Sequence, residues 1–331
     1  MTFQILSLSG GGYRGLFTIE VLARLEEQAR RPIGECFDLV AGTSIGGIIA
    51  IGLAMGKTAK EIKAVFLEEG ETIFPRGERP ITWLGKQLAR LESYFGGPKY
   101  DGVALRAAIA RILDPDVLIG HAQTRLLIPS INMTKGSVQI FKTPHDSRLV
   151  VDLHRKAIDV AMATSAAPLF FPLAKIDDSY FADGGLVANS PDACAVHEAI
   201  HFADQKPHDL RVLSIGTTST GFSLPTSLGP SLGGAEWLKN ERLISTVFSS
   251  QQQLVDFMMR HQLGDRYLRI DVRSSAEQSV DLGMDLATPA RRSTLLGLAE
   301  GAHQDIAGSH FISVVLAHQR SPVDFASQLK R

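Results

Sequence analysis

The chain has 331 residues, with 34 Lys and Arg against 35 Asp and Glu, a formal net charge of −1 and 44% hydrophobic residues. This composition excludes an intrinsically disordered chain, which would combine few apolar residues with a high net charge. The balanced charge gives no reason to expect a broad surface for DNA or RNA. The two cysteines, Cys36 and Cys194, leave room for one disulfide at most, and free thiols fit a reducing cytosol.

The N-terminal residues predict no signal peptide, and the chain predicts no membrane-spanning helix. Met1-Thr2-Phe3-Gln4 lacks a basic start and passes directly into a strand-like run. The longest nearly uncharged helical run, residues 45–55, is shorter than the roughly 20 residues that span a bilayer. We therefore expect contact with lipid only at a membrane surface.

The first elements alternate short apolar strands with glycine-rich turns and apolar helices. Residues 5–9 form a strand that ends at a glycine cluster, and a helix with apolar residues on one face follows. The same order repeats from residue 37 to about residue 55. This alternation predicts an α/β fold with a mainly parallel sheet covered on both faces. The predicted strands are residues 5–9, 37–41, 126–131 and 210–216.

Later segments predict helices and one long loop. Residues 57–115 are mostly helical and form a helical cap on the sheet, with an amphipathic face in 81–95. Residues 217–234 are rich in Gly, Ser, Thr and Pro and predict a loop, followed by one long helix over 235–261. Segments 81–95 and 217–234 are candidates for a lid or a lipid contact, or else ordinary packing and a surface loop. No repeat or linker interrupts residues 1–331, so we expect a single domain.

The first glycine cluster, Gly10-Gly11-Gly12-Tyr13-Arg14-Gly15, follows a strand and opens a helix. Its G-x-G-x-x-G pattern suits a nucleotide phosphate, and it equally suits an oxyanion hole made by free backbone N–H groups. A dinucleotide site would need an acidic residue at the end of the next strand, whereas Asp38 lies at the beginning of that strand. A tight turn without chemistry is the remaining alternative.

The second motif, Gly42-Thr43-Ser44-Ile45-Gly46, fits the G-x-S-x-G nucleophile elbow. The flanking Gly42 and Gly46 relieve steric clashes at the sharp turn between strand and helix. Gly229-Pro230-Ser231-Leu232-Gly233 matches the same pattern, but it lies in a Gly- and Pro-rich loop. The context therefore favours Ser44 as a nucleophile and Ser231 as a coincidence.

The third motif, Asp183-Gly184-Gly185, follows a strand-like run. This pattern alone is typical of a turn. None of the ten histidines stands out as a partner for Ser44, however, so a carboxylate is the better candidate base. A desolvated Asp183 with a raised pKa would suit that role.

A competing pattern, His197-Glu198-Ala199-Ile200-His201, fits the H-E-x-x-H helix of zinc hydrolases. Both histidines would lie on one helical face, with the glutamate as base. No third ligand is marked in the sequence. The alternative is the exposed side of an amphipathic helix.

The three glycine-containing motifs occur in the order and settings found in the patatin-like phospholipases, which the sequence resembles over roughly residues 3–300. Residues 70–120 match least. Further segments that resemble the family are Ala163-Thr164-Ser165-Ala166-Ala167-Pro168, Tyr267-Leu268-Arg269-Ile270 and Met284-Asp285-Leu286-Ala287.

The resemblance implies a three-layer α/β/α fold and hydrolysis of acyl esters of membrane phospholipids by a Ser-Asp dyad, without a metal or organic cofactor. It makes Ser44 the nucleophile and Asp183 the base. Gly11 and Gly12 would supply the oxyanion hole, with Gly10 shaping the turn and Arg14 supporting the loop by hydrogen bonding. Gly42, Gly46, Gly184 and Gly185 would support the two catalytic turns.

Within that family the sequence is similar to bacterial cytosolic effectors of antiphage signalling. The segments that carry this similarity are residues 5–12, residues 37–47 and Phe74-Pro75. It implies activation by a cyclic dinucleotide and reversible attack on the inner membrane from the cytoplasm. No motif localises a nucleotide pocket, and a homodimer remains open.

Overall fold

The computed structural model describes residues 2–75, 97–218, 222–239, 242–272 and 283–330. Within them, eight strands form one sheet in the order β5-β6-β3-β2-β1-β7-β8, with β4 beside β3. Strands β1, β2, β3, β7 and β8 run parallel, and β4, β5 and β6 run antiparallel to their neighbours. The strands are β1 Phe3–Leu8, β2 Leu39–Gly42, β3 Arg125–Asn132, β4 Ser137–Lys142, β5 Ala174–Ile176, β6 Ser179–Asp183, β7 Leu210–Ile215 and β8 Tyr267–Ile270.

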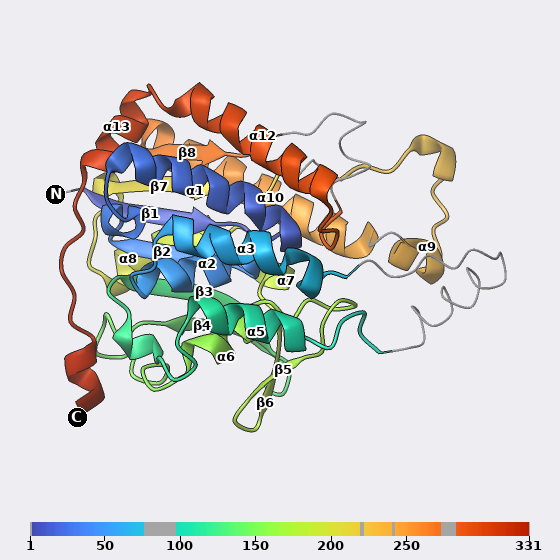
Figure 1. Cartoon of the computed structure of the whole chain (residues 1–331), viewed down its shortest axis with the longest axis horizontal. Helices are drawn as coiled ribbons and strands as arrows, with labels where there is room; N and C mark the ends of the chain where they lie inside the picture. Colours follow the sequence, from blue (N-terminus) through green and yellow to red (C-terminus); the bar gives the residue numbers. More distant parts are fainter. Residues whose placement is uncertain (1, 76–96, 219–221, 240–241, 273–282, 331) are drawn as a thin grey trace.

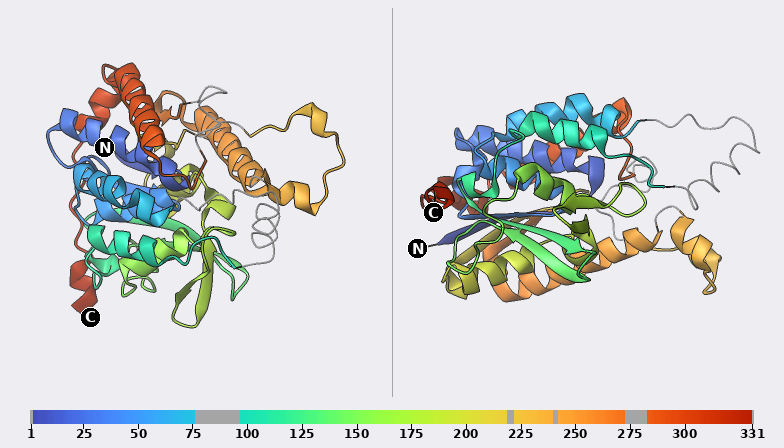
Figure 2. Two further views of the ribbon diagram at one scale, coloured as in Figure 1. Left: turned by 45° about the vertical axis from the view of Figure 1, so that its right-hand side comes forward. Right: turned by 90° about the horizontal axis from the view of Figure 1, so that it is seen from below.

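Helices cover both faces of this sheet (Figures 1 and 2). One layer contains α1 Gly15–Ala29, α2 Ile45–Ala54, α3 Ala59–Ile73, α5 Val103–Ile112, α6 Ala157–Thr164, α12 Pro289–Ile306 and α13 His310–Ala317. The other contains α8 Asp192–Phe202 and α10 Arg242–Leu263. Two short helices, α7 Gly185–Ala188 and α9 Gly234–Leu238, flank α10.

The two layers follow from the period-two alternation of side chains along the strands. In β1, Leu6 and Leu8 face the larger helical layer, whereas Phe3 and Ile5 face α8 and α10. Because both faces are covered, all six residues of β1 are buried. The predicted three-layer α/β/α fold with a mainly parallel sheet is confirmed.

The order of pairing along β3 positions the site. β4 pairs with Leu127–Asn132 and occupies one edge of β3. The other edge therefore pairs first with β2, at residues 125–127, and then with β6, at residues 130–132. β2 and β6 run in opposite directions, so their C-terminal ends meet. Ser44 follows β2 and Asp183 ends β6, and the two are brought together there.

Two of the predicted helical segments can be compared with the structure. In the predicted cap, α3 and α5 pack in the helical layer on the sheet, while residues 81–95 lie outside the described residues. The single helix expected over 235–261 is wrong, because α9 ends at Leu238 and Lys239 adopts the extended ψ of 130° before α10 begins. Residues 239–242, Lys-Asn-Glu-Arg, contain neither Gly nor Pro, so no residue that commonly ends a helix marks the break. The single-domain assignment stays a prediction.

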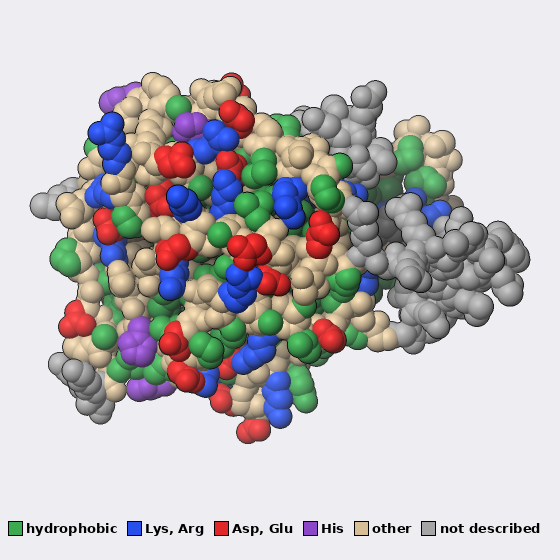
Figure 3. Space-filling view, viewed as in Figure 1, with side chains coloured by type: hydrophobic (Ala, Val, Ile, Leu, Met, Phe, Trp, Pro, Cys, Tyr) green, Lys and Arg blue, Asp and Glu red, His purple; other side chains and the backbone are tan. Residues whose placement is uncertain are grey.

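On the face drawn in Figure 3, acidic and basic side chains are interspersed over the helices. Both cysteines are free thiols, with Cys36 buried in the core. None of the helices in the described ranges has the length and apolarity needed to cross a membrane.

Candidate active site

Ser44 occupies a strained turn between β2 and α2. Its φ of 54° and ψ of −124° are unusual for a non-glycine residue. The turn is tight, since a Cβ on Gly46 would lie 2.4 Å from the carbonyl oxygen of Leu8. The structure thus has the geometry expected of a nucleophile elbow. The matching Ser231 lies in an exposed loop.

Asp183 lies at the end of β6 and is fully buried. Its Oδ1 accepts a hydrogen bond of 2.6 Å from the Gly185 N–H, whereas Oδ2 has no well-formed hydrogen bond among the described residues. Burial raises the pKa of Asp183 to about 7, and the hydrogen bonds from Gly185 and the Ser44 hydroxyl oppose part of that rise. The carboxyl group is therefore a stronger proton acceptor than a solvated aspartate.

Thr164, the last residue of α6, connects the segments that hold Ser44 and Asp183. Its Oγ1 accepts a 3.0 Å hydrogen bond from the Ser44 N–H and donates one of 2.6 Å to the carbonyl oxygen of Pro129 in β3. Its own carbonyl accepts from the Gly184 N–H at 3.2 Å. One buried threonine thus fixes the backbone at Ser44 and the backbone next to Asp183.

The glycine cluster places two free backbone donors beside this pair. The Gly10 N–H donates to the Asn189 carbonyl at 3.0 Å, so it is occupied. The N–H groups of Gly11 and Gly12 donate to no residue that the structure describes, and both glycines line the same pocket as Ser44. At Gly12, φ is +59° and a Cβ would lie 2.2 Å from the Met284 carbonyl oxygen, so a side chain is excluded. Arg14 Nε donates to the Gly11 carbonyl at 3.3 Å.

A buried polar network supports the start of this loop. Arg269, with a side chain 6% exposed, donates from Nη1 to Ser190 Oγ at 2.9 Å and to Ser214 Oγ at 2.8 Å, and from Nη2 to Asp271 at 2.7 Å. Ser190 Oγ lies 3.1 Å from the Oγ of Ser9, which is the residue directly before Gly10. The network ties β1, β7 and β8 together beneath the free N–H groups.

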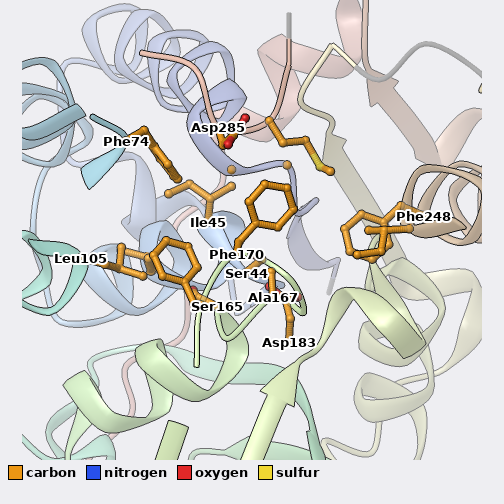
Figure 4. Close-up of a pocket in the computed structure, with 16 residues that line it drawn as sticks. Ser44, Ile45, Phe74, Leu105, Ser165, Ala167, Phe170, Asp183, Phe248 and Asp285 are labelled. Carbon is orange, nitrogen blue, oxygen red and sulfur yellow. The ribbon is translucent and has the colours of Figure 1, made fainter. Parts of the chain in front are cut away.

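The pocket around Ser44 and Asp183 is mainly apolar (Figure 4). Aromatic and aliphatic side chains approach it from both helical layers, including Phe74 and Phe248, and from the loop before β5, including Phe170. Asp285 is the other acidic residue at its wall, and it is paired with Lys99 and with the Tyr100 hydroxyl. The pocket suits an apolar chain whose polar end reaches the serine.

Comparison with known proteins identifies the family. A family model described as patatin-like phospholipase matches residues 6–192. A cGAMP-activated phospholipase of Pseudomonas aeruginosa is 39% identical over 320 residues, covering 96% of this chain and 93% of the relative. The chain belongs to the patatin-like phospholipase family. It is therefore a lipid hydrolase, as the sequence predicted.

Other matches extend the comparison. A cGAMP-activated phospholipase of Vibrio cholerae is 38% identical, and the match covers 88% of each chain. Among solved structures, VipD from Legionella pneumophila aligns over 98% of this chain and 68% of VipD, with 12% identity and a TM-score of 0.46.

The acidic residue that a dinucleotide site would need is engaged elsewhere in this patatin-like phospholipase. Asp38 lies at the N-terminal end of β2, away from the glycine cluster. Its carboxylate accepts hydrogen bonds from the backbone N–H groups of Gln4, at 2.9 Å, and Ser321, at 3.0 Å, and lies 2.7 Å from His318 Nε2. The carboxyl end of β2 leads instead into Ser44.

The H-E-x-x-H pattern lies on α8, on the other side of the sheet from α2. His197 and His201 are exposed and stack on each other with ring centroids 4.4 Å apart. Glu198 is buried and pairs with Lys142 and His145 at 2.5 and 2.9 Å. Within the described ranges, no group of three His, Cys, Asp or Glu side chains could hold a metal ion. The glutamate that a zinc hydrolase would use as base is thus held by two other side chains.

Sequence patterns did not single out several residues that shape this patatin-like site. Asn189 accepts from Gly10, Thr164 holds Ser44, and Arg269 lies under the loop. Thr164 and Arg269 fall in segments that resemble the family, and this was the only signal for them. Their roles depend on contacts between distant segments, which no local spacing reveals.

Proposed function

We propose that this protein cleaves fatty-acyl esters of membrane phospholipids through a Ser44–Asp183 dyad. Asp183 accepts the proton of the Ser44 hydroxyl as the serine oxygen attacks the ester carbonyl carbon. The N–H groups of Gly11 and Gly12 stabilise the negative oxygen of the tetrahedral intermediate. Collapse of that intermediate breaks the bond to the glycerol oxygen, which takes the proton from Asp183 and leaves an acyl-enzyme on Ser44.

The second half-reaction uses the same groups. Asp183 accepts a proton from a water molecule, and the resulting hydroxide attacks the acyl carbonyl. When this intermediate collapses, the fatty acid leaves and Asp183 returns its proton to the Ser44 oxygen. No step needs a metal or organic cofactor, so we expect a chelator to leave the rate unchanged.

One observation carries the proposal most strongly. A fully buried carboxylate, with its pKa raised to about 7, lies where β6 meets the strained turn that holds Ser44. A structural aspartate gains nothing from burial without a compensating charge. A general base that works near neutral pH, in contrast, requires the raised pKa that this burial produces.

The proposal also covers where and when the enzyme acts. We expect a cytoplasmic protein that reaches the inner membrane surface reversibly and serves in bacterial antiphage defence. The names of the Pseudomonas and Vibrio relatives support activation by a cyclic dinucleotide such as cGAMP. A homodimer stays a prediction.

Purified protein is tested on vesicles of bacterial phospholipids with and without a panel of cyclic dinucleotides. We expect fatty-acid release to increase with one of them, and a fluorophosphonate probe to label Ser44. Ser44→Ala and Asp183→Asn should each lower the rate by at least about a thousandfold.

Ser231→Ala is the matched control, because Ser231 lies in the other G-x-S-x-G match, and it should keep the full rate. Near-normal hydrolysis by Ser44→Ala or Asp183→Asn contradicts the dyad. Nucleotide binding without any ester hydrolysis or labelling would instead favour a nucleotide-binding module that uses Gly10 to Gly15.

A further inference from the structure

A second apolar groove lies next to the active-site pocket. Its lining comes from the loop before β5, from α7, and from α9 and α10, and every side chain in it is hydrophobic. Leu169, in the loop before β5, and Leu243, on α10, remain 46% and 47% exposed there. Large apolar side chains in a concave, water-facing groove are typical of a ligand site.

The groove and the active-site pocket share their walls. On α10, Ile244 lines both cavities, Phe248 lines the pocket, and Leu243 and Val247 line the groove. Residues one turn apart lie on the same helical side, so Ile244 and Phe248 face the serine while Leu243 and Val247 face the groove. The helix therefore forms a ridge between two neighbouring apolar cavities.

The loop on the opposite side is divided in the same way. Ala167 and Phe170 line the active-site pocket, whereas Pro168 and Leu169 line the groove. Leu169 holds a φ of 72°, which an L-residue with a large side chain rarely adopts. Its carbonyl accepts from the Lys99 N–H at 2.9 Å, so the surrounding structure fixes this conformation. Strain of this kind persists where it presents a side chain to a site.

We propose that this groove binds the second acyl chain of a two-chain phospholipid whose first chain occupies the Ser44 pocket. The inference rests on the proposed phospholipase function. The two acyl chains of a glycerophospholipid leave adjacent carbons of the glycerol, so they enter two channels that run side by side. The ridge at Ile244 separates the chains, and the glycerol lies above it with one ester at Ser44. The groove thereby selects diacyl lipids over single-chain lipids.

The test compares substrates in one type of detergent mixed micelle, with the cyclic dinucleotide panel present. The substrates are diacyl phosphatidylethanolamine, its single-chain lyso form, and the short ester p-nitrophenyl butyrate. Leu243→Asp should lower kcat/KM for the diacyl lipid about tenfold and change the other two by less than about twofold. Leu169→Asn repeats the test from the other wall with a residue that tolerates positive φ.

Leu254→Asp is the matched control. Leu254 lies on the same helix, is 60% exposed and is outside the groove. It should leave all three rates unchanged.

Three outcomes would overturn the proposal. Equal losses on diacyl and lyso lipid would show that the groove does not read the second chain. A loss with Leu254→Asp that matches Leu243→Asp would indicate general contact of α10 with the lipid surface, and unchanged rates in both groove variants would show that no chain binds there. If the wild-type protein hydrolyses none of the esters, the phospholipase function itself fails, which separates the two conclusions.

Discussion

Asp183 meets two opposing requirements at one position. Its burial without a cationic partner among the described residues makes the carboxylate a better base, and the same burial destabilises the folded protein once the group is ionised. The site therefore trades stability for reactivity, as active sites often do. Both effects can be measured.

The first measurable effect is the pH dependence of hydrolysis. Asp183 must be ionised to accept a proton, and its pKa is raised to about 7. We expect kcat/KM to rise as the pH increases through about 7 and to level off above it, with the slope of a single proton. The profile is measured with p-nitrophenyl butyrate. A plateau that begins below about pH 5 would show that Asp183 is not desolvated in this way.

The second effect is on stability. The folded-state pKa of Asp183, about 7, lies above the ordinary value of 3.8, so the wild-type protein loses stability as the pH rises from about 4 to about 7. The Asp183→Asn variant does not ionise at this position, so at pH 8 it should unfold at a higher urea concentration than the wild type. Its free energy of unfolding should be higher by up to about 4 kcal/mol. The gain should shrink by about 2–3 kcal/mol at pH 5. An equal gain at both pH values would contradict the raised pKa.

Thr164 offers a test of backbone positioning. Thr164→Val keeps the shape but leaves the buried Ser44 N–H and the Pro129 carbonyl without their partner. We expect a loss of about 1–3 kcal/mol in unfolding free energy and about a tenfold lower kcat. Thr164→Ser keeps the hydroxyl and should retain most of the rate. Equal rates in the valine and serine variants would exclude a role for the hydroxyl.

At the scale of elements, the shared edge of β3 explains how Ser44 and Asp183 come together. β2 and β6 approach each other from opposite directions, so the turn after β2 and the turn after β6 occupy adjacent space. α6 ends at the same point and supplies Thr164. The site thus depends on three elements that meet at one end of the sheet.

Replacement of Arg269 on β8 tests whether the buried polar network supports the glycine loop. Arg269→Met removes the cation between Asp271 and Asp192, whose carboxylates lie 2.7 and 4.0 Å from the guanidinium. A buried carboxylate left without its partner costs about 3–5 kcal/mol, which urea denaturation should detect. Arg260→Met is the control, because Arg260 is 58% exposed and its pair with Asp256 should contribute less than about 1 kcal/mol. Equal effects of the two variants would contradict the network.

Local patterns predicted the elements whose signals lie within one segment. The strands β1, β2, β3 and β7 were expected within two residues of their observed ends, because buried parallel strands form continuous apolar runs. β4 and β5 were not expected, since β4 is partly exposed and β5 has only three residues. Ser44 and Asp183 were found from glycine-flanked turns. Asn189 was not, because its carbonyl acts on Gly10 from a distant part of the chain.

At the scale of the whole molecule, Asp38 connects the two ends of the chain. Its carboxylate binds the backbone of Gln4 in β1 and of Ser321 beyond α13, and it contacts His318. Arg320 adds a hydrogen bond of 2.6 Å to Thr124. The C-terminal segment thereby runs along the N-terminal end of the strands (Figure 1).

Removal of this contact should release the C-terminal segment. The Asp38→Ala variant lacks several hydrogen bonds to a charged group. We expect its free energy of unfolding to be lower by at least about 3 kcal/mol. Limited trypsin digestion should then cut after Arg320 faster than in the wild-type protein, with the product identified by mass spectrometry. Asp305→Ala, at an exposed position on α12, should leave the cleavage rate unchanged. Unaltered cleavage in Asp38→Ala would show that other contacts hold the segment.

The meeting of β2 and β6 has a consequence during protein synthesis. The ribosome completes the turn with Ser44 long before it adds Asp183, and Arg269 beneath the glycine loop comes later still. A nascent chain or a prematurely terminated fragment that stops before Asp183 contains the proposed nucleophile without the proposed base. Such fragments should be harmless to the membranes of the cell that makes them. Under the proposed function, the wide spacing of the site along the chain thus delays lipid hydrolysis until more than half of the chain has been made.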